Sequence, residues 1–467
     1  MAGPPSTSSA GRRPSQGPKV QPGTFGHGSP LEGQSFETIA EKLKDTTIDY
    51  KVKTNLATEL RDAIDMYQKD LDLGKLFEVL LPCFTDILRT GEPAFRSNSG
   101  EHKLRNLLIQ ILHRLPHVEP LRQHAPDLMS LLLYLLRIES EDNAALCMKV
   151  IIDLHRTYSR PPSPSSTAPA VAGADAAGTT PTTDPTVVQI EQSVDEFLEI
   201  VAELFKNMGS VVEETFRDTG NRTTRSQVSG SGAAAGGGSG ADVQSPSSAG
   251  GPPSIGGDSD AGGGPAQPVI HAPAMRSFKL LQDCPASIVF IFQTYRPLVN
   301  KAITIFVPLV FDFIQMQAEP QRRKHESMEP GKSWVGICPE IPKEKRGAFQ
   351  DMVMAQTKTM SFLAYIHRVS NTALSSYLNV LPEIAVRLMK DCPSEAVAMK
   401  RDLIIATRHI LQSDLRTAFL SQIDTLLDEH VLTGNSVTGH ENLRPLAFSM
   451  LADLIHHCRA ELTLPQL

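Results

Sequence analysis

Residues 76–116 read LFEVLLPCFTDILRTGEPAFRSNSGEHKLRNLLIQILHRLP, and this stretch decides the fold. Apolar residues recur in it at steps of three and four, which is typical of two amphipathic helices in succession. The arrangement returns in residues 123–157. Pro126 lies 44 residues after Pro82, and the same offset relates Arg105 to Lys149. The sequence therefore contains a repeated helix pair.

The C-terminal part repeats this arrangement. Helical patterns at residues 377–391 and 399–412 form one predicted pair, and those at 419–429 and 443–458 form the next, with Arg401 and Arg444 43 residues apart. A helix pair with a period of roughly 40–47 residues is the signature of HEAT and armadillo arrays, in which neighbouring pairs stack into one elongated core. No stretch shows the alternation of a strand. The predicted fold is an all-α, HEAT-repeat-type α-solenoid with disordered inserts.

Three segments rich in Gly, Ser, Pro and Ala interrupt this pattern. Such sequence buries too little apolar surface to offset chain entropy, so we expect these segments to be flexible. The expected organisation is a disordered tail at 1–30, HEAT-like repeats at 31–158, a disordered linker at 159–186, an amphipathic helix of the array at 187–217, a Gly/Ser-rich disordered insert at 218–268, and HEAT-like repeats at 269–467 that look truncated.

Charge and composition exclude several classes of function. The chain has 467 residues with 45 Lys+Arg and 52 Asp+Glu, a formal net charge of −7, whereas nucleic-acid binders generally need a basic excess. We expect no direct specific nucleic-acid binding. Six cysteines stand far apart and are predicted to be free thiols in the helix cores. The most apolar stretch, residues 286–314, is interrupted by polar residues, so we interpret it as a buried helix and expect no membrane partner.

Catalytic and metal-binding motifs are incomplete. Gly331, Lys332 and Ser333 resemble the end of a phosphate-binding loop, but Glu326 occupies the position of its first glycine. His113 and His117 are separated by Pro116 and have no acid or cysteine at ligand spacing. Signatures of serine hydrolases and kinases are missing from the sequence. We therefore predict a protein that is not an enzyme and has no catalytic residues, cofactor or metal.

Four basic residues recur near the repeat period on the second helix of each pair: Arg105, Lys149, Arg401 and Arg444. One hypothesis is a row of cations on a concave face that binds acidic peptide segments. The alternative is structural, because repeats of this type commonly use a basic residue to hydrogen-bond an acidic or amide residue of the adjacent repeat. The helicity of an Arg105→Glu variant distinguishes the two, since only the structural role predicts its collapse.

Long stretches of the chain resemble one protein family. These are residues 101–123, 358–369, 400–430 and 443–460, and they are similar to the N-terminal HEAT region of the TRRAP family, very large pseudokinases related to the phosphatidylinositol 3-kinase-like kinases. The resemblance covers most of the chain from residue 31 onward, without the linkers. The later solenoid and the kinase-like domain of that family are missing from this sequence, and the Gly/Ser-rich insert departs from a compact repeat.

The resemblance implies a function. Members of the family are non-catalytic scaffolds of SAGA-type and related histone acetyltransferase coactivator complexes in the nucleus. It implies two kinds of partner: other subunits of such a complex, and transcription activators, whose acidic activation segments would bind the four cations. The alternative is a HEAT-repeat adaptor of another class, such as a nuclear transport protein or a phosphatase regulatory subunit.

Overall fold

The computed structural model describes residues 31, 33–67, 71–159, 184–217, 269–327, 335–370, 372–393, 396–412, 414–434 and 437–466. Within these ranges the regular elements are α-helices and short 3-10 helices, and β-structure is limited to isolated bridges. The all-α prediction is confirmed. The predicted tail at 1–30, the insert at 218–268 and most of the linker at 159–186 lie outside the described residues.

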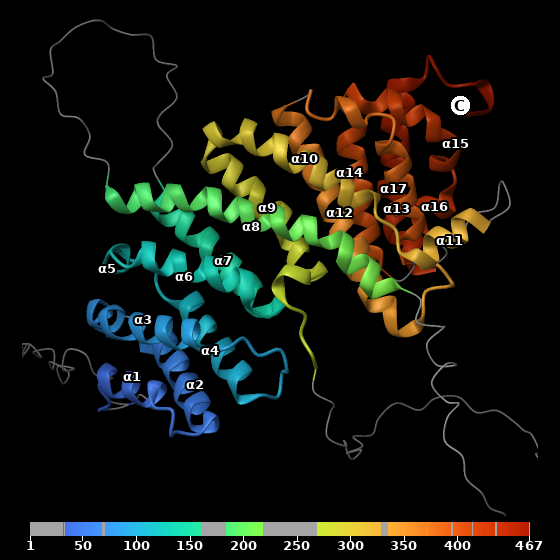
Figure 1. Cartoon of the computed structure of the whole chain (residues 1–467). Coiled ribbons are helices and arrows are strands. Elements are labelled where there is room, and N and C mark those ends of the chain that lie inside the picture. Colours follow the sequence, from blue (N-terminus) through green and yellow to red (C-terminus); the bar gives the residue numbers. More distant parts are fainter. Residues whose placement is uncertain are drawn as a thin grey trace, which may run out of the picture.

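The described helices form successive pairs whose members alternate between two layers (Figure 1). The pairs are α1 (Phe36–Lys44) with α2 (Tyr50–Tyr67), α3 (Leu73–Thr90) with α4 (Gly100–Arg114), α6 (Ala125–Ile138) with α7 (Glu141–Tyr158), α8 (Pro185–Phe216) with α9 (Phe278–Thr294), α10 (Val299–Gln315) with α12 (Arg346–Val369), α13 (Leu381–Asp391) with α14 (Val397–Leu411), and α16 (Glu429–Thr433) with α17 (Val437–Cys458).

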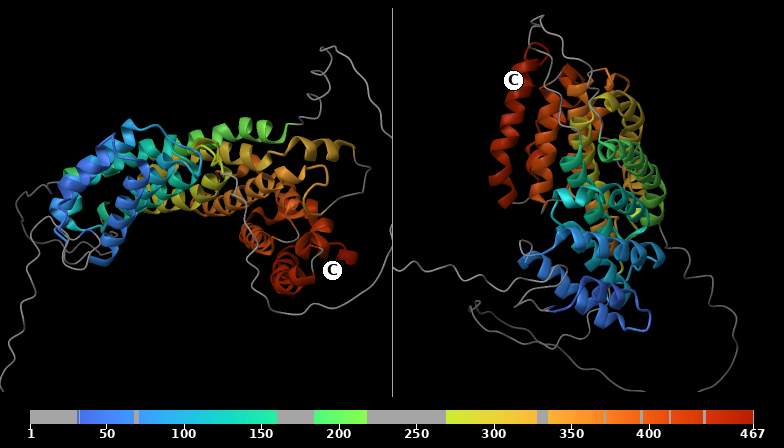
Figure 2. Two further views of the ribbon diagram at one scale, coloured as in Figure 1. Left: turned by 90° about the horizontal axis from the view of Figure 1, so that it is seen from below. Right: turned by 90° about the vertical axis from the view of Figure 1, so that its left-hand side faces the viewer.

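The layers run along the length of an elongated array (Figure 2). In the second layer each helix packs on the next, in the order α2, α4, α7, α9, α12, α14 and α17. Each pair thus buries its apolar stripe against its neighbours, which is how a solenoid builds one continuous core. The predicted HEAT-repeat-type α-solenoid agrees with this arrangement.

The long insert divides one repeat in two. Helix α8 ends at Phe216, and its partner α9 begins at Phe278, beyond residues 218–268. The chain entering α9 first pairs with earlier repeats, through the bridges Arg96↔Ile270 and Ser140↔Pro273. The array therefore continues across the insert, because two helices separated by a long segment still pack as one pair.

Helix α8 is the longest described helix, and its sequence explains both its start and its packing. The Asp184 side chain accepts a hydrogen bond from the Thr186 backbone N–H and caps the helix, so the helix begins within the predicted linker. Phe205 of its apolar stripe meets Phe306 and Phe313 of α10 in edge-to-face geometry, with ring centroids 6.3 and 5.9 Å apart. Aromatic packing of this kind joins the repeats on either side of the insert.

Helix α10 makes up most of the segment Arg296–Gln315, which is long and apolar enough to cross a membrane by length and composition alone. Half of this segment is buried inside the protein, between α8 on one side and α12 on the other. That is the usual environment of a core helix in a solenoid.

One local prediction was wrong. The helix expected at residues 419–429 is replaced by 3-10 turns from Asp414 to Gln422, followed by the single-turn helix α15 (Ile423–Leu426). A further short helix, α11 (Glu319–Ser327), lies between α10 and α12. Buried contacts made by Pro320 and Gln321 hold this charged helix on the array, and neither contact follows from the local pattern.

Candidate partner-binding surface

Arg105 is buried in the structure and holds three elements together. Its guanidinium forms an ion pair with the fully buried Glu139, with Nη2 to Oε1 at 2.5 Å, and donates hydrogen bonds to the backbone carbonyls of Leu88 and Gly91. The two carbonyls belong to the C-terminal end of α3, where backbone acceptors are left over, and Glu139 ends α6. A partner cannot reach this group, so the expectation that Arg105 binds acidic segments is wrong.

A polar network extends from Arg105 across neighbouring repeats. Asn143 of α7 donates a hydrogen bond to Glu139 at 3.0 Å and accepts one from Asn106 of α4 at 2.7 Å. Asn106 in turn accepts from Gln110, which accepts from Arg61 of α2. This is the ladder that the structural alternative predicted for Arg105. Buried polar groups satisfied in this way fix the register of one repeat on the next.

Gly91 provides the space that the Arg105 guanidinium needs. A Cβ atom at this position would lie 3.1 Å from Arg105 Nη1 and 3.0 Å from the Ile87 carbonyl oxygen. We expect Gly91→Ala to lower the free energy of unfolding by about 1–2 kcal/mol, because the buried ion pair must shift. Gly347→Ala in α12 is the matched control, since a Cβ there meets nothing within 4 Å. Urea denaturation of both variants measures this, and equal effects would contradict the role of Gly91.

The other three predicted cations are exposed. Lys149 of α7 is exposed and forms no ion pair among the described residues. Arg401 approaches the adjacent Asp402 at 3.4 Å, and Arg444 pairs with Glu429 at 2.9 Å, yet both guanidinium-bearing side chains remain more than half exposed. The Arg444 guanidinium also lies over the Phe448 ring, 5.7 Å from its centroid. Exposed ion pairs of this kind contribute little to stability, so a charged partner can compete for both arginines.

Arg401 and Arg444 each stand one helical turn before an exposed apolar side chain. These are Ile405 on α14 and Phe448 on α17, which are 37% and 52% exposed. The same offset of 43 residues relates Arg401 to Arg444 and Ile405 to Phe448, and α14 packs directly on α17. We call these four residues the α14/α17 patch. Sequence analysis found its two arginines, but it missed the apolar pair because exposure is invisible in the sequence.

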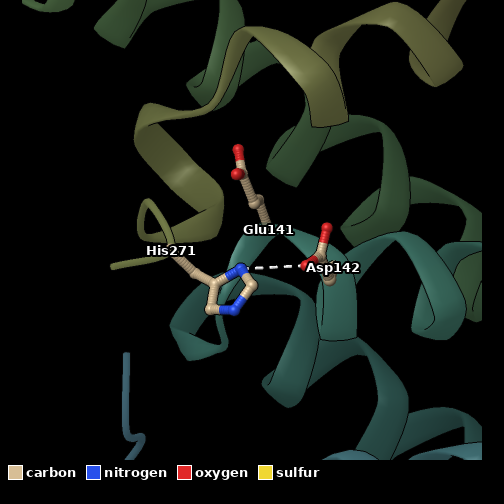
Figure 3. A group of neighbouring side chains, drawn as sticks. All are labelled: Glu141, Asp142 and His271. Carbon is tan, nitrogen blue, oxygen red and sulfur yellow. Dashed lines mark ion pairs between the residues drawn. The ribbon is translucent and has the colours of Figure 1, made fainter. Parts of the chain in front are cut away.

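One group of side chains has the spacing of a metal site (Figure 3). Glu141, Asp142 and His271 bring their ligand atoms within 4.8 Å of one another. Asp142 already pairs with His271 Nδ1 at 2.9 Å, while Glu141 accepts hydrogen bonds from Ser277 and from Lys279. Both Glu141 oxygens and His271 Nδ1 are thus already engaged within the protein, so this group is explained as a set of contacts that anchors residues 269–277.

The six cysteines are free and buried, as predicted. Burial raises the pKa of the Cys83 thiol to about 11 and raises that of Cys147 as well. Because the thiolate is the reactive form, these groups are inert side chains of the core.

Comparison with known proteins covers nearly the whole chain. The family model of the Tra1 HEAT repeat central region matches residues 348–467. The Saccharomyces cerevisiae protein named SAGA complex/NuA4 acetyltransferase complex subunit TRA1 is 28% identical over 93% of this chain, and its Schizosaccharomyces pombe counterpart is 30% identical over 91%. The chain belongs to the TRRAP family. The human transformation/transcription domain-associated protein is 28% identical over 91% of this chain.

This member of the TRRAP family spans only about a tenth of the length of the relatives it matches. The similarity therefore concerns the HEAT repeats alone.

Proposed function

We propose that this chain is a non-catalytic scaffold that acts in the nucleus within a histone acetyltransferase coactivator complex. Two fungal relatives are named as subunits of SAGA and NuA4 acetyltransferase complexes. The repeats described here provide what a scaffold needs, namely a long surface held rigid by a continuous core and by buried polar ladders. Partners of this chain would accordingly be subunits of such a complex.

We further propose that the α14/α17 patch binds the acidic activation segments of transcription activators. The observation that carries this proposal is the repeated pairing of an exposed arginine with an exposed apolar side chain on two adjacent helices. Activation segments combine carboxylates with bulky apolar residues, so the patch offers a complementary surface for both. Lys149 lacks this combination, because Asp153 stands one turn after it.

The test compares variants of the full chain by fluorescence anisotropy with a labelled acidic–hydrophobic activation peptide. We expect Arg444→Glu/Phe448→Asp to weaken binding at least about tenfold, because the variant removes an anchor and adds two like charges. Lys149→Glu is the matched control and should change affinity less than about twofold. Circular dichroism should show equal helicity in both, since all three side chains are exposed. Equal affinity of the two variants would reject the patch while leaving the scaffold proposal intact.

A further inference from the structure

A groove lies between α8 and α10, on the other layer of the array from the α14/α17 patch. Its volume is about 500 Å³. Figure 1 shows α8 crossing the middle of the molecule with α10 beside it. The floor is apolar and is formed by the side chains Leu198, Ala202, Leu298, Ala302, Ile305 and Phe306.

The apolar floor is partly open to solvent. Phe306 is buried below it, but Ile305 is 46% exposed, which is unusual for an isoleucine in the middle of a core helix. An exposed aliphatic side chain at the centre of a concave surface favours docking of an apolar partner side chain.

One edge of the groove is acidic. Asp195, Glu199 and Glu203 of α8 line it at four-residue steps, and Glu191 precedes them at the same step. Like charges at this spacing lie on one face and repel, which destabilises a helix. A cationic ligand along the row would relieve that repulsion.

Basic side chains near the groove neutralise its acidic edge only in part. Lys301 approaches Asp195 at 3.8 Å from the opposite edge, and Arg137 of α6 pairs with Glu203. Between them, Glu199 is exposed and forms no ion pair among the described residues. Lys206 and Lys301 also line the groove, and Glu199 is the acid of this edge that has no cation paired with it among the described residues.

We propose that this groove binds an amphipathic helix of a partner protein that carries Lys or Arg along one edge of its apolar face. A helix lying between α8 and α10 would place its apolar residues on Ile305 and Ala302 and its basic edge on Asp195 and Glu199. This is helix-in-groove recognition, in which apolar anchors provide affinity and the charged edge fixes orientation. Its ligand has the opposite charge to the one proposed for the α14/α17 patch, so one chain would hold two partners of different chemistry.

The test uses two synthetic 20-residue helical peptides with the same leucine face, one with lysines along an edge and one with glutamates there. Anisotropy with the full chain at low salt should show binding of the lysine peptide at least about tenfold tighter than that of the glutamate peptide. Glu199→Lys should remove most of this preference, and Ile305→Asp should weaken both peptides.

Matched controls are Glu196→Lys, an exposed acid of α8 outside the groove, and Val369→Asp, an exposed apolar residue of α12. Both should bind the lysine peptide within about twofold of the unchanged protein. Equal binding of the two peptides, or an effect of Glu196→Lys as large as that of Glu199→Lys, would overturn the proposal. Self-association of the chain that is lost in Ile305→Asp would also overturn it, since a second copy would then be the occupant.

Discussion

Arg105→Glu should lower the free energy of unfolding by about 3–5 kcal/mol and cost the N-terminal repeats much of their helicity. The substitution places a second carboxylate beside Glu139, which is fully buried, and leaves the Leu88 and Gly91 carbonyls without their donor. Removing one partner of a buried ion pair strands the other charge in a medium of low dielectric constant. Circular dichroism during urea denaturation measures both effects.

Two further variants separate this role from a general effect of charge. Lys149→Glu makes the same change on an exposed face of α7 and should alter stability by less than about 0.5 kcal/mol. Arg105→Met/Glu139→Gln should be more stable than Arg105→Met alone, because it no longer buries an unpaired carboxylate. If Arg105→Glu unfolds at the same urea concentration as Lys149→Glu, the ladder does not hold these repeats together.

Asp391→Asn should stabilise the protein above neutral pH. Burial raises the pKa of the Asp391 carboxyl to about 7, although Arg387 and a hydrogen bond from Gln321 act in the opposite direction. A raised pKa means that the folded state favours the protonated form, so this contribution to stability is present at low pH and is lost as pH rises toward and through 7. Asparagine keeps an acceptor for Gln321 and carries no charge to bury.

The expected difference in unfolding free energy between Asp391→Asn and the unchanged protein grows by about 2–3 kcal/mol from pH 5 to pH 8. Comparison with the unchanged protein at each pH cancels other titrations, such as that of the buried His155, whose pKa burial lowers to about 4. Asp453→Asn is the control of opposite sign, because a hydrogen bond from Arg408 lowers the pKa of that carboxyl. It should destabilise the protein at pH 8. A pH-independent effect of Asp391→Asn would show that the carboxyl is ionised in the fold.

The helix pairs could be predicted from sequence. Apolar residues at steps of three and four indicate the helices, and the repeat of 43–44 residues indicates that the helices stack as pairs. The role of individual basic residues could not. The offset of 44 residues made Arg105 and Lys149 seem equivalent, but the N-caps of their helices, Ser99 and Ser140, are 41 residues apart. Lys149 therefore stands almost one turn further along its helix than Arg105 does along its own. Lys149 is exposed, whereas Arg105 is buried against Glu139, a residue outside both helices.

The groove between α8 and α10 could not be predicted from the sequence either. The four-residue spacing of acidic residues on α8 can be read from the sequence. The apolar floor, however, comes partly from α10, which begins more than 80 residues after α8 ends, beyond the long insert. Periodicity describes one helix at a time, and the stacking of α8 on α10 follows only from the three-dimensional array.

A scaffold of a histone acetyltransferase complex should carry that activity with it when it is isolated. The experiment is affinity purification of the tagged full chain from its own cells, followed by a histone acetyltransferase assay of the eluate. We expect acetyltransferase activity to co-purify with the chain, and we expect the eluate to contain other subunits of one such complex. Recovery of the intact chain without acetyltransferase activity or any of those subunits would contradict it.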